Sequence, residues 1–165
     1  MQYGGTGHYY EYIAANLTHG GASASAQGMS YLGASGYLAT ITSAGENAFV
    51  AGLLGGNNGW IGGAFDGTSW SWVETGEGTF WSGTNFGSAV AGKYANWDAG
   101  EPNNSGGNEP FIIMRASGRW QDYNPFNNDV SGYVVEYAVP APGALGLVVS
   151  GLLGLALVRR RSTSA

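Results

Sequence analysis

The chain has 165 residues, of which 44% are hydrophobic and 13% aromatic, and it contains no cysteine. This composition excludes a disordered chain, a disulfide framework and a thiolate metal site, and it indicates one loop-rich domain followed by a short tail. Half of the basic residues lie at positions 159–161, so the remaining body is strongly acidic, which excludes nucleic acid as a partner.

Before residue 60 the sequence predicts strands over residues 8–13 and 36–41, a helix over residues 20–32 and a second helix between Ser43 and Gly55. Aromatic and β-branched residues favour the strands, whereas glycines weaken the prediction of the first helix. Ser43 and Glu46 have the form of a capping box, with Ser43 as the N-cap. Apolar residues follow at helical spacing, and the helix is expected to end at Gly55.

After residue 60 the sequence predicts strands over residues 60–63, 70–73, 111–114 and 132–137, with a long loop over residues 75–108. A loop of this length within a compact domain is usually functional. Most of the tryptophans are expected in the core: Trp60, Trp70, Trp72 and Trp120. For Trp81 and Trp97, which are expected close to the loop, a core position is favoured over stacking on a ligand.

Five side chains with oxygen donors stand out in and after this loop: Glu101, Asn103, Glu109, Gln121 and Asp122. Carboxylate and amide oxygens suit Ca²⁺, which takes 6–8 oxygen ligands, and they suit zinc or copper poorly. Pro102 could hold a cis peptide bond that aims Glu101 and Asn103 at one point. On composition alone, however, the segment also reads as an ordinary surface loop.

These donors carry a resemblance to a known family. Glu101-Pro102-Asn103, Glu109 and Trp120-Gln121-Asp122 resemble the sugar-binding calcium site of C-type lectin domains, and Trp60-Ile61-Gly62 resembles that family's central strand motif. The resemblance covers about residues 7–138 and implies an α+β fold, in which two helices pack on small antiparallel sheets beside a long functional loop.

The resemblance also implies how the site works. In the family, protein oxygens fill most of the calcium shell, and two adjacent sugar hydroxyls complete it. The E-P-N form goes with mannose-type sugars, so Glu101, Asn103, Glu109 and Gln121 are expected to contact both ion and sugar, while Asp122 binds the ion. Gln121 departs from the family, which has asparagine there. Glutamine keeps the amide oxygen on a stem that is one methylene longer.

Residues 139–165 form a second unit, in which an uncharged stretch over about 142–158 precedes Arg159-Arg160-Arg161. This stretch is barely long enough to cross a hydrocarbon core of ~30 Å, and the arginines would place its C-terminal end in the cytoplasm. The tail resembles the PEP-CTERM sorting signal of Gram-negative bacteria, which implies cleavage by an exosortase-type enzyme. Ala141 stands where that motif usually has glutamate, and a simple membrane anchor is the alternative.

A tail of this kind implies export to the cell surface or the extracellular matrix, which normally requires an N-terminal signal peptide. Residues 1–7 are glycine-rich and contain no apolar secretory core. We therefore expect that Met1 is an internal start or that the chain is a fragment.

Enzyme chemistry is not expected. Glu101 with Glu109, or Glu74 with Glu77, could form the carboxylate pair of a glycosidase. A carboxylate that binds Ca²⁺, however, has a lowered pKa and is a poor general acid. Glu74 and Glu77 are expected to be exposed charges, and His8 a half-buried structural residue.

The sequence therefore predicts an exported bacterial surface protein that binds a mannose-type glycan or exopolysaccharide through one Ca²⁺. The alternative is an adhesive or structural module in which calcium stiffens the loop and the partner is a protein. An enzyme acting on polysaccharide is the third possibility.

Overall fold

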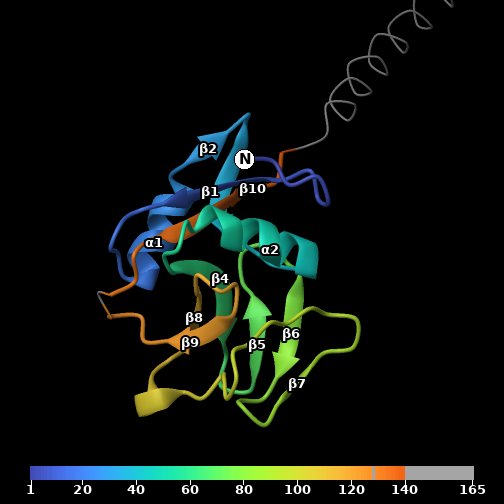
Figure 1. Ribbon diagram of the computed structural model, residues 1–165, viewed down its shortest axis with the longest axis vertical. Helices are drawn as coiled ribbons and strands as arrows, with labels where there is room; N and C mark the ends of the chain where they lie inside the picture. The colour runs from blue at the N-terminus through green and yellow to red at the C-terminus, as the bar shows by residue number, and fades with distance from the viewer. Residues whose placement is uncertain (128, 140–165) are drawn as a thin grey trace, which may run out of the picture.

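The computed structural model describes residues 1–127 and 129–139, which form one α+β domain (Figure 1). Within these residues the elements are β1 (Tyr9–Ile13), α1 (His19–Gln27), β2 (Ser30–Tyr31), β3 (Ala34–Leu38), α2 (Ala44–Leu53), β4 (Gly59–Phe65), β5 (Ser69–Trp72), β6 (Gly78–Ser82), β7 (Ser88–Ala89), the 3₁₀ turn η1 (Ser105–Gly107), β8 (Phe111–Met114), β9 (Trp120–Tyr123) and β10 (Tyr133–Tyr137). The predicted α+β class with two helices is confirmed, but the sheet is mixed rather than wholly antiparallel, because β10 pairs with β4 in parallel.

The strand β10 is the link between the two ends of the domain. It pairs antiparallel with β1 along one edge. Along its other edge it pairs antiparallel with β3 and meets β4 in parallel at the Tyr133–Trp60 bridge. From β4 the sheet continues in two directions, through β5, β6 and β7 and through β8 and β9. In Figure 1 the N-terminus and the end of β10 lie at one end of the molecule, and η1 lies at the opposite end.

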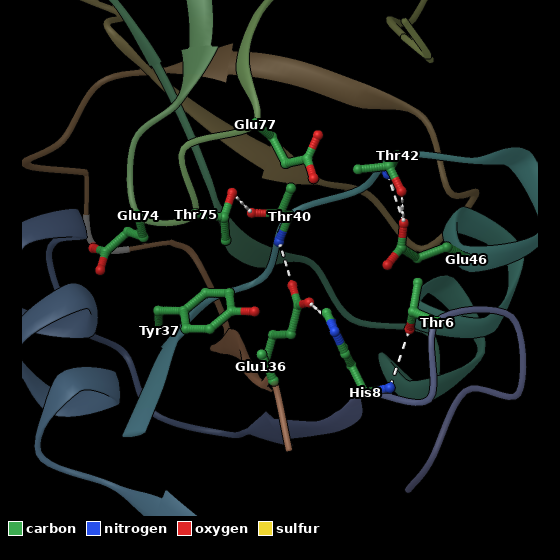
Figure 2. A pocket seen from close by; sticks show the side chains of 11 residues that line it. Thr6, His8, Tyr37, Thr40, Thr42, Glu46, Glu74, Thr75, Glu77 and Glu136 are labelled. Carbon is green, nitrogen blue, oxygen red and sulfur yellow. Dashed lines mark hydrogen bonds and ion pairs between the residues drawn. The ribbon is translucent and has the colours of Figure 1, made fainter. Parts of the chain in front are cut away.

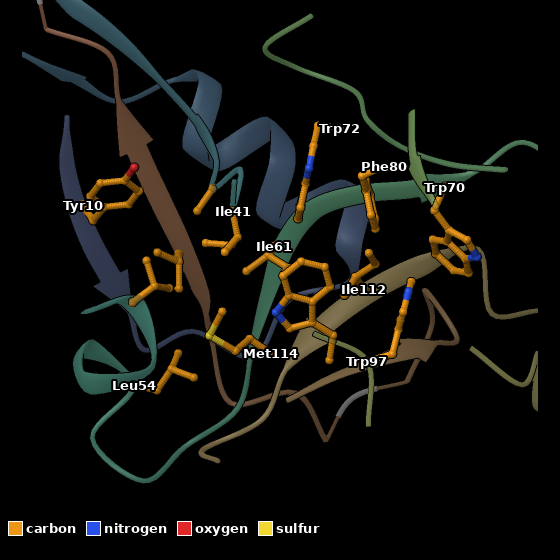
Figure 3. Packing of buried hydrophobic residues seen from close by; sticks show 14 residues of the cluster. Tyr10, Ile41, Leu54, Ile61, Trp70, Trp72, Phe80, Trp97, Ile112 and Met114 are labelled. Atoms are coloured by element: carbon orange, nitrogen blue, oxygen red, sulfur yellow. The ribbon is translucent and has the colours of Figure 1, made fainter. Parts of the chain in front are cut away.

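The core is largely aromatic, because tryptophans from separate strands pack against one another around β4 (Figure 3). The Trp72 and Phe80 rings stack with centroids 4.6 Å apart, and Trp70 meets Trp97 edge to face at 4.9 Å. The predicted core positions of Trp60, Trp70, Trp72 and Trp120 are confirmed. Trp97 is also a core residue with 8% exposure, so its indole face is not free to stack on a ligand.

The first helix is shorter than predicted. It begins after Thr18, whose side chain caps Gly21 N–H, and it ends at Gly28. Residues 29–32 were expected to be helical, but Ser30 and Tyr31 instead pair with β3. The chain reverses there because Leu32 and Gly33 both have positive φ angles, which a continuing helix does not allow.

The second helix confirms the predicted N-cap, since Ser43 Oγ accepts from Glu46 N–H at 3.2 Å. The reciprocal bond of a capping box is not formed with Ser43 N–H. Glu46 is buried and accepts instead from Thr42 N–H and from the Tyr10 hydroxyl. Its carboxylate therefore joins α2 to β1 in addition to stabilising the helix start.

The predicted loop over residues 75–108 is partly wrong, because it contains β6 and β7. Phe80 of β6 is fully buried against the core, which gives this segment a reason to pair with β5. No helix within residues 1–127 and 129–139 has the length and apolar character needed to cross a membrane. The span expected over 142–158, and with it the C-terminal hydrophobic helix, lies outside the described residues.

Candidate functional site

The loop with the predicted donors is fixed to β9 by backbone hydrogen bonds on either side of Trp97. Trp120 N–H donates to Asn96 O at 2.9 Å, and Asp98 N–H donates to Trp120 O at 2.8 Å. The indoles of Trp97 and Trp120 also pack together in the core, with ring centroids 5.9 Å apart. Core packing therefore positions the start of the loop beside the strand that carries Asp122.

Asp122 lies at the centre of the candidate site. Its side chain is fully buried, and its two carboxylate oxygens accept the backbone N–H groups of Asn103 at 3.0 Å and Asn104 at 2.7 Å. The preceding Glu101–Pro102 peptide bond is cis, as the sequence suggested. These contacts hold the Glu-Pro-Asn turn against the end of β9, although Asp122 is about twenty residues further along the chain.

The other predicted donors surround this turn. Glu101 Oε2 accepts from Asn103 N–H at 3.1 Å, and Ser105 N–H donates to both Asn103 Oδ1 at 2.7 Å and Glu109 Oε2 at 2.5 Å. Glu101, Asn103, Glu109 and Asp122 thus belong to one hydrogen-bonded network. Their side chains accept mainly from backbone N–H groups, so the network holds several oxygen atoms close together without a basic partner.

Two carboxylates in this network, those of Glu101 and Glu109, have raised pKa values. Burial, followed by the hydrogen bond with Asp122 and its negative charge, raises the pKa of Glu101 to about 7. Burial and the charge of Asp122 also raise the pKa of Glu109. Within the described residues no ion pair compensates either group. Such a set of hard oxygen donors fits a divalent cation such as Ca²⁺ by charge and by donor type.

The side chains of this network are not yet arranged to coordinate an ion. In the described part of the chain, no three carboxylate or imidazole side chains already converge as a metal site. Some of the bonds from backbone N–H groups to side-chain oxygens would have to be exchanged for contacts with an ion.

Gln121 is the one predicted donor that the structure does not bring into this network. Successive side chains of a strand alternate between faces, and Gln121 lies on the face of β9 opposite to Asp122. Its Oε1 accepts from Arg115 Nη1 at 2.7 Å.

Sequence reasoning did not single out two asparagines that shape the site. Asn104 has a positive φ of 49°, which asparagine tolerates, and its Oδ1 accepts from Glu109 N–H at 3.0 Å. Asn47 is buried on α2, where it donates to Gly118 O and accepts from the Trp120 indole. The Asn-Asn-Ser-Gly-Gly run signals the first as a turn residue. Asn47 gives no local signal, because its partners are about seventy residues away.

Comparison with known proteins agrees with this arrangement. Residues 31–131 match the family model described as Lectin C-type domain. The chain belongs to the C-type lectin domain family. The matched region includes both helix α2 and the whole candidate site.

The chain is similar to parts of two other proteins. The chain is 38% identical over 135 residues to Halomucin of Haloquadratum walsbyi, a match that covers 79% of this chain and 1% of that protein. It is 37% identical over 105 residues to Ladderlectin of Oncorhynchus mykiss, covering 58% of this chain and 47% of that protein. The chain therefore matches less than half the length of either relative.

Among solved structures, the C-type lectin CEL-I from Cucumaria echinata superposes with a TM-score of 0.61. The sequence identity is 22%, and the match covers 79% of this chain and 89% of that one. At this identity the similarity establishes the fold alone.

This C-type lectin domain has a second polar region, a pocket of about 350 Å³ where β1, β10 and the start of α2 meet (Figure 2). The buried carboxylate of Glu136 lies 2.6 Å from His8 Nδ1 and accepts from Thr40 N–H at 2.8 Å. The predicted half-buried, structural position of His8 is confirmed. The hydrogen bond and charge of Glu136 raise the pKa of His8 against the opposing effect of burial.

Glu74 and Glu77, the two glutamates set aside as a catalytic pair, line the same pocket, and Glu74 is half-buried rather than exposed. Glu74 accepts from Ser23 and Gln27 of α1, and the exposed Glu77 pairs with Lys93 at 3.3 Å. Both have structural partners at the surface.

Proposed function

We propose that this domain binds carbohydrate in a calcium-dependent manner through the loop over residues 101–109 and the end of β9. The observation that carries this proposal is the buried carboxylate of Asp122, which accepts the N–H groups of Asn103 and Asn104 and thereby gathers Glu101, Asn103 and Glu109 around itself. Membership of the C-type lectin domain family supports it.

The residues that would hold Ca²⁺ are Glu101, Asn103, Glu109 and Asp122. Gln121 would join these ligands if its amide oxygen gave up the hydrogen bond from Arg115 and turned to bind the ion instead. Bound calcium supplies open coordination positions for hard oxygen ligands, and paired sugar hydroxyls are ligands of that kind. The carboxylates of Glu101 and Glu109 would accept hydrogen bonds from the same hydroxyls, and the amide of Asn103 would donate one.

The ligand we propose is a mannose-type sugar or an exopolysaccharide built from such sugars, in keeping with the Glu101-Pro102-Asn103 sequence. A single shallow site makes few contacts against the cost of association, so affinity for one sugar should be weak. Repeated epitopes on a polymer would compensate for that weakness. We propose no catalytic role for these carboxylates.

The test is retention on a mannose matrix in the presence of Ca²⁺, with elution by EDTA. Asn103→Ala should abolish retention, because it removes a donor to both the ion and the sugar. Asn85→Ala is the matched control, since this exposed amide lies in the β6–β7 turn. Retention that survives both EDTA and Asn103→Ala would refute the proposal.

A protein partner is the other candidate function, in which calcium only orders the loop. That function predicts calcium-dependent thermal stabilisation without competition by any glycan. Turnover of a polysaccharide by the purified domain would instead indicate an enzyme.

We also propose, from the sequence alone, that the protein is an exported bacterial surface protein. Residues 1–138 would be the lectin domain and residues 139–165 a PEP-CTERM-like sorting tail that contacts the membrane and an exosortase-type enzyme. Mass spectrometry of the protein recovered from the cell surface tests this. A mature C-terminus near residue 142 is expected, whereas an intact Arg159-Arg160-Arg161 end would favour the simple anchor.

A further inference from the structure

A polar cleft of about 390 Å³ lies on the face of β9 that points away from Asp122. Its walls come from the turn after α2, from the β8–β9 hairpin and from the chain after β9. Its polar lining includes Asn57, Asn58, Arg115, Gln121, Tyr123 and Asp129. The calcium and sugar site proposed above does not use this cleft, apart from Gln121.

The cleft is held in shape by its own hydrogen bonds. Arg115 Nη1 donates to Gln121 Oε1 at 2.7 Å, and the Tyr123 hydroxyl donates to Asp129 Oδ2 at 2.6 Å. Asn58 Oδ1 accepts from Ser131 N–H at 2.7 Å, which fixes the turn after α2 to the chain that follows β9. These pairs keep the polar groups in place before any ligand arrives, which lowers the cost of binding.

Free hydrogen-bonding capacity remains after these internal bonds. Arg115 is exposed and, within the described residues, forms no ion pair, so most of its five N–H donors are available. Asp129 retains acceptor capacity, and the amide nitrogen of Gln121 retains donors. Forked guanidinium, amide and carboxylate groups match pairs of neighbouring hydroxyls.

The charges of the cleft favour a neutral ligand. Arg115 and Asp129 contribute one positive and one negative charge, so the lining carries no net charge. The body around it is acidic, with only three basic residues outside positions 159–161. A polyanion would be repelled by this body, whereas a neutral polyol would not.

The cleft lies next to the candidate calcium site. Tyr123 follows Asp122 directly in β9 and pairs with Phe111, which is two residues after Glu109. The Tyr123 side chain therefore belongs to the cleft, one residue away from the carboxylate that anchors the donor loop.

We propose that this cleft is a second sugar subsite, which binds the neutral residue adjacent to the sugar held at the calcium site. The inference rests on the proposed function and adds to it that the ligand is an oligosaccharide of at least two residues. Arg115 and Asp129 contact the second sugar, while Tyr123 positions Asp129.

The test is calorimetric titration of the full chain in saturating Ca²⁺ with methyl α-mannoside and with the 1,2-, 1,3- and 1,6-linked α-mannobioses. At least one disaccharide should bind about tenfold more tightly than the monosaccharide, a difference of about 1.4 kcal/mol. In Arg115→Met and in Asp129→Asn, this affinity ratio should fall to about one. Lys93→Met removes a positive charge outside the cleft and should keep the ratio of the unmodified protein.

The outcomes separate the two proposals. If the monosaccharide binds and no disaccharide binds more tightly, the subsite is wrong and the calcium-dependent sugar site stands. The subsite is also wrong if the ratio is retained in both Arg115→Met and Asp129→Asn. Failure of every sugar to bind in Ca²⁺ removes the proposed function and the subsite with it.

Discussion

The indole Nε1 of Trp120 donates to Oδ1 of Asn47 at 2.8 Å, and this bond ties α2 to the strand that carries Asp122. Both residues are buried, so water cannot take the place of either partner if this hydrogen bond is lost. The same asparagine donates to Gly118 O at the β8–β9 turn. Helix α2 therefore stabilises the strand that carries the candidate site, although it contributes no ligand to that site.

Replacing Asn47 by alanine should lower the free energy of unfolding by about 2 kcal/mol, because the buried Trp120 N–H loses its acceptor. Gly118 O still accepts from Asn96 Nδ2 at 2.7 Å, so the loss of its hydrogen bond from Asn47 should cost little stability. Urea denaturation measures the change. The exposed Asn85→Ala control should stay close to the unmodified protein, and equal stability of the two variants would contradict the role given to Asn47.

Calcium should stabilise the folded domain. At a free Ca²⁺ concentration one hundred times the dissociation constant, the free energy of unfolding should rise by about 2.7 kcal/mol, because only the folded chain gathers the donors. Thermal melting with Ca²⁺ and then with excess EDTA measures this gain. Asn103→Ala should reduce it. An identical melting temperature under both conditions would show that residues 101–109 and Asp122 bind no calcium.

His19 should make the domain less stable in mild acid. Its ring stacks on Phe111 with centroids 3.6 Å apart, and burial lowers its pKa from 6.5 to about 4. The unfolded chain therefore binds the proton more readily than the folded one, so stability is retained above pH 6.5 and is lost as the pH falls towards 4. The full loss is about 3 kcal/mol at most.

Urea denaturation of the unmodified protein and of His19→Phe between pH 7 and pH 4 isolates this contribution. The phenylalanine variant keeps a ring against Phe111 and cannot take up the proton, so its stability should fall less steeply with decreasing pH. His8 acts in the opposite sense, because its raised pKa stabilises the fold at low pH. Parallel slopes for the two proteins would rule out His19 as the cause.

Two glycine-to-alanine changes should have opposite effects on stability. At Gly62 of β4, an added methyl group would lie 2.4 Å from Leu38 O, a backbone atom in the centre of the domain. This variant should lose roughly 3 kcal/mol or more, or fail to fold. At Gly52 of α2 an added methyl group would meet no neighbouring part of the described chain within 4 Å, so alanine should stabilise the helix by about 1 kcal/mol. Thermal melting of both variants checks the pair.

The parts of the fold that depend on neighbouring residues were predictable from the sequence. Ser43 caps α2, and the tryptophans at positions 60, 70, 72 and 120 enter the core, because local pattern determines both. Residues 78–82 were missed as a strand. Their pairing depends on burying Phe80 against Trp72 of the neighbouring strand and against Trp120, which lies about forty residues further along the chain.

The sequence predicted which candidate side chains gather near the loop, but not the direction in which each of them points. The motif placed Glu101, Asn103, Glu109 and Asp122 in one region, and the structure joins them through backbone N–H groups. The motif could not show that the Gln121 side chain points towards Arg115. That orientation depends on a hydrogen bond with a guanidinium on the other strand of the β8–β9 hairpin. Asn47 was invisible for the same reason, since only the folded chain brings it to Trp120.

The pairing of β1 with β10 brings both described ends of the domain together, far from η1 and the donor loop (Figure 1). Flanking sequence attached at either end would therefore emerge from the same pole. Such a domain can be inserted into a longer polypeptide, or strung with copies of itself, while its recognition loop points outward and stays uncovered.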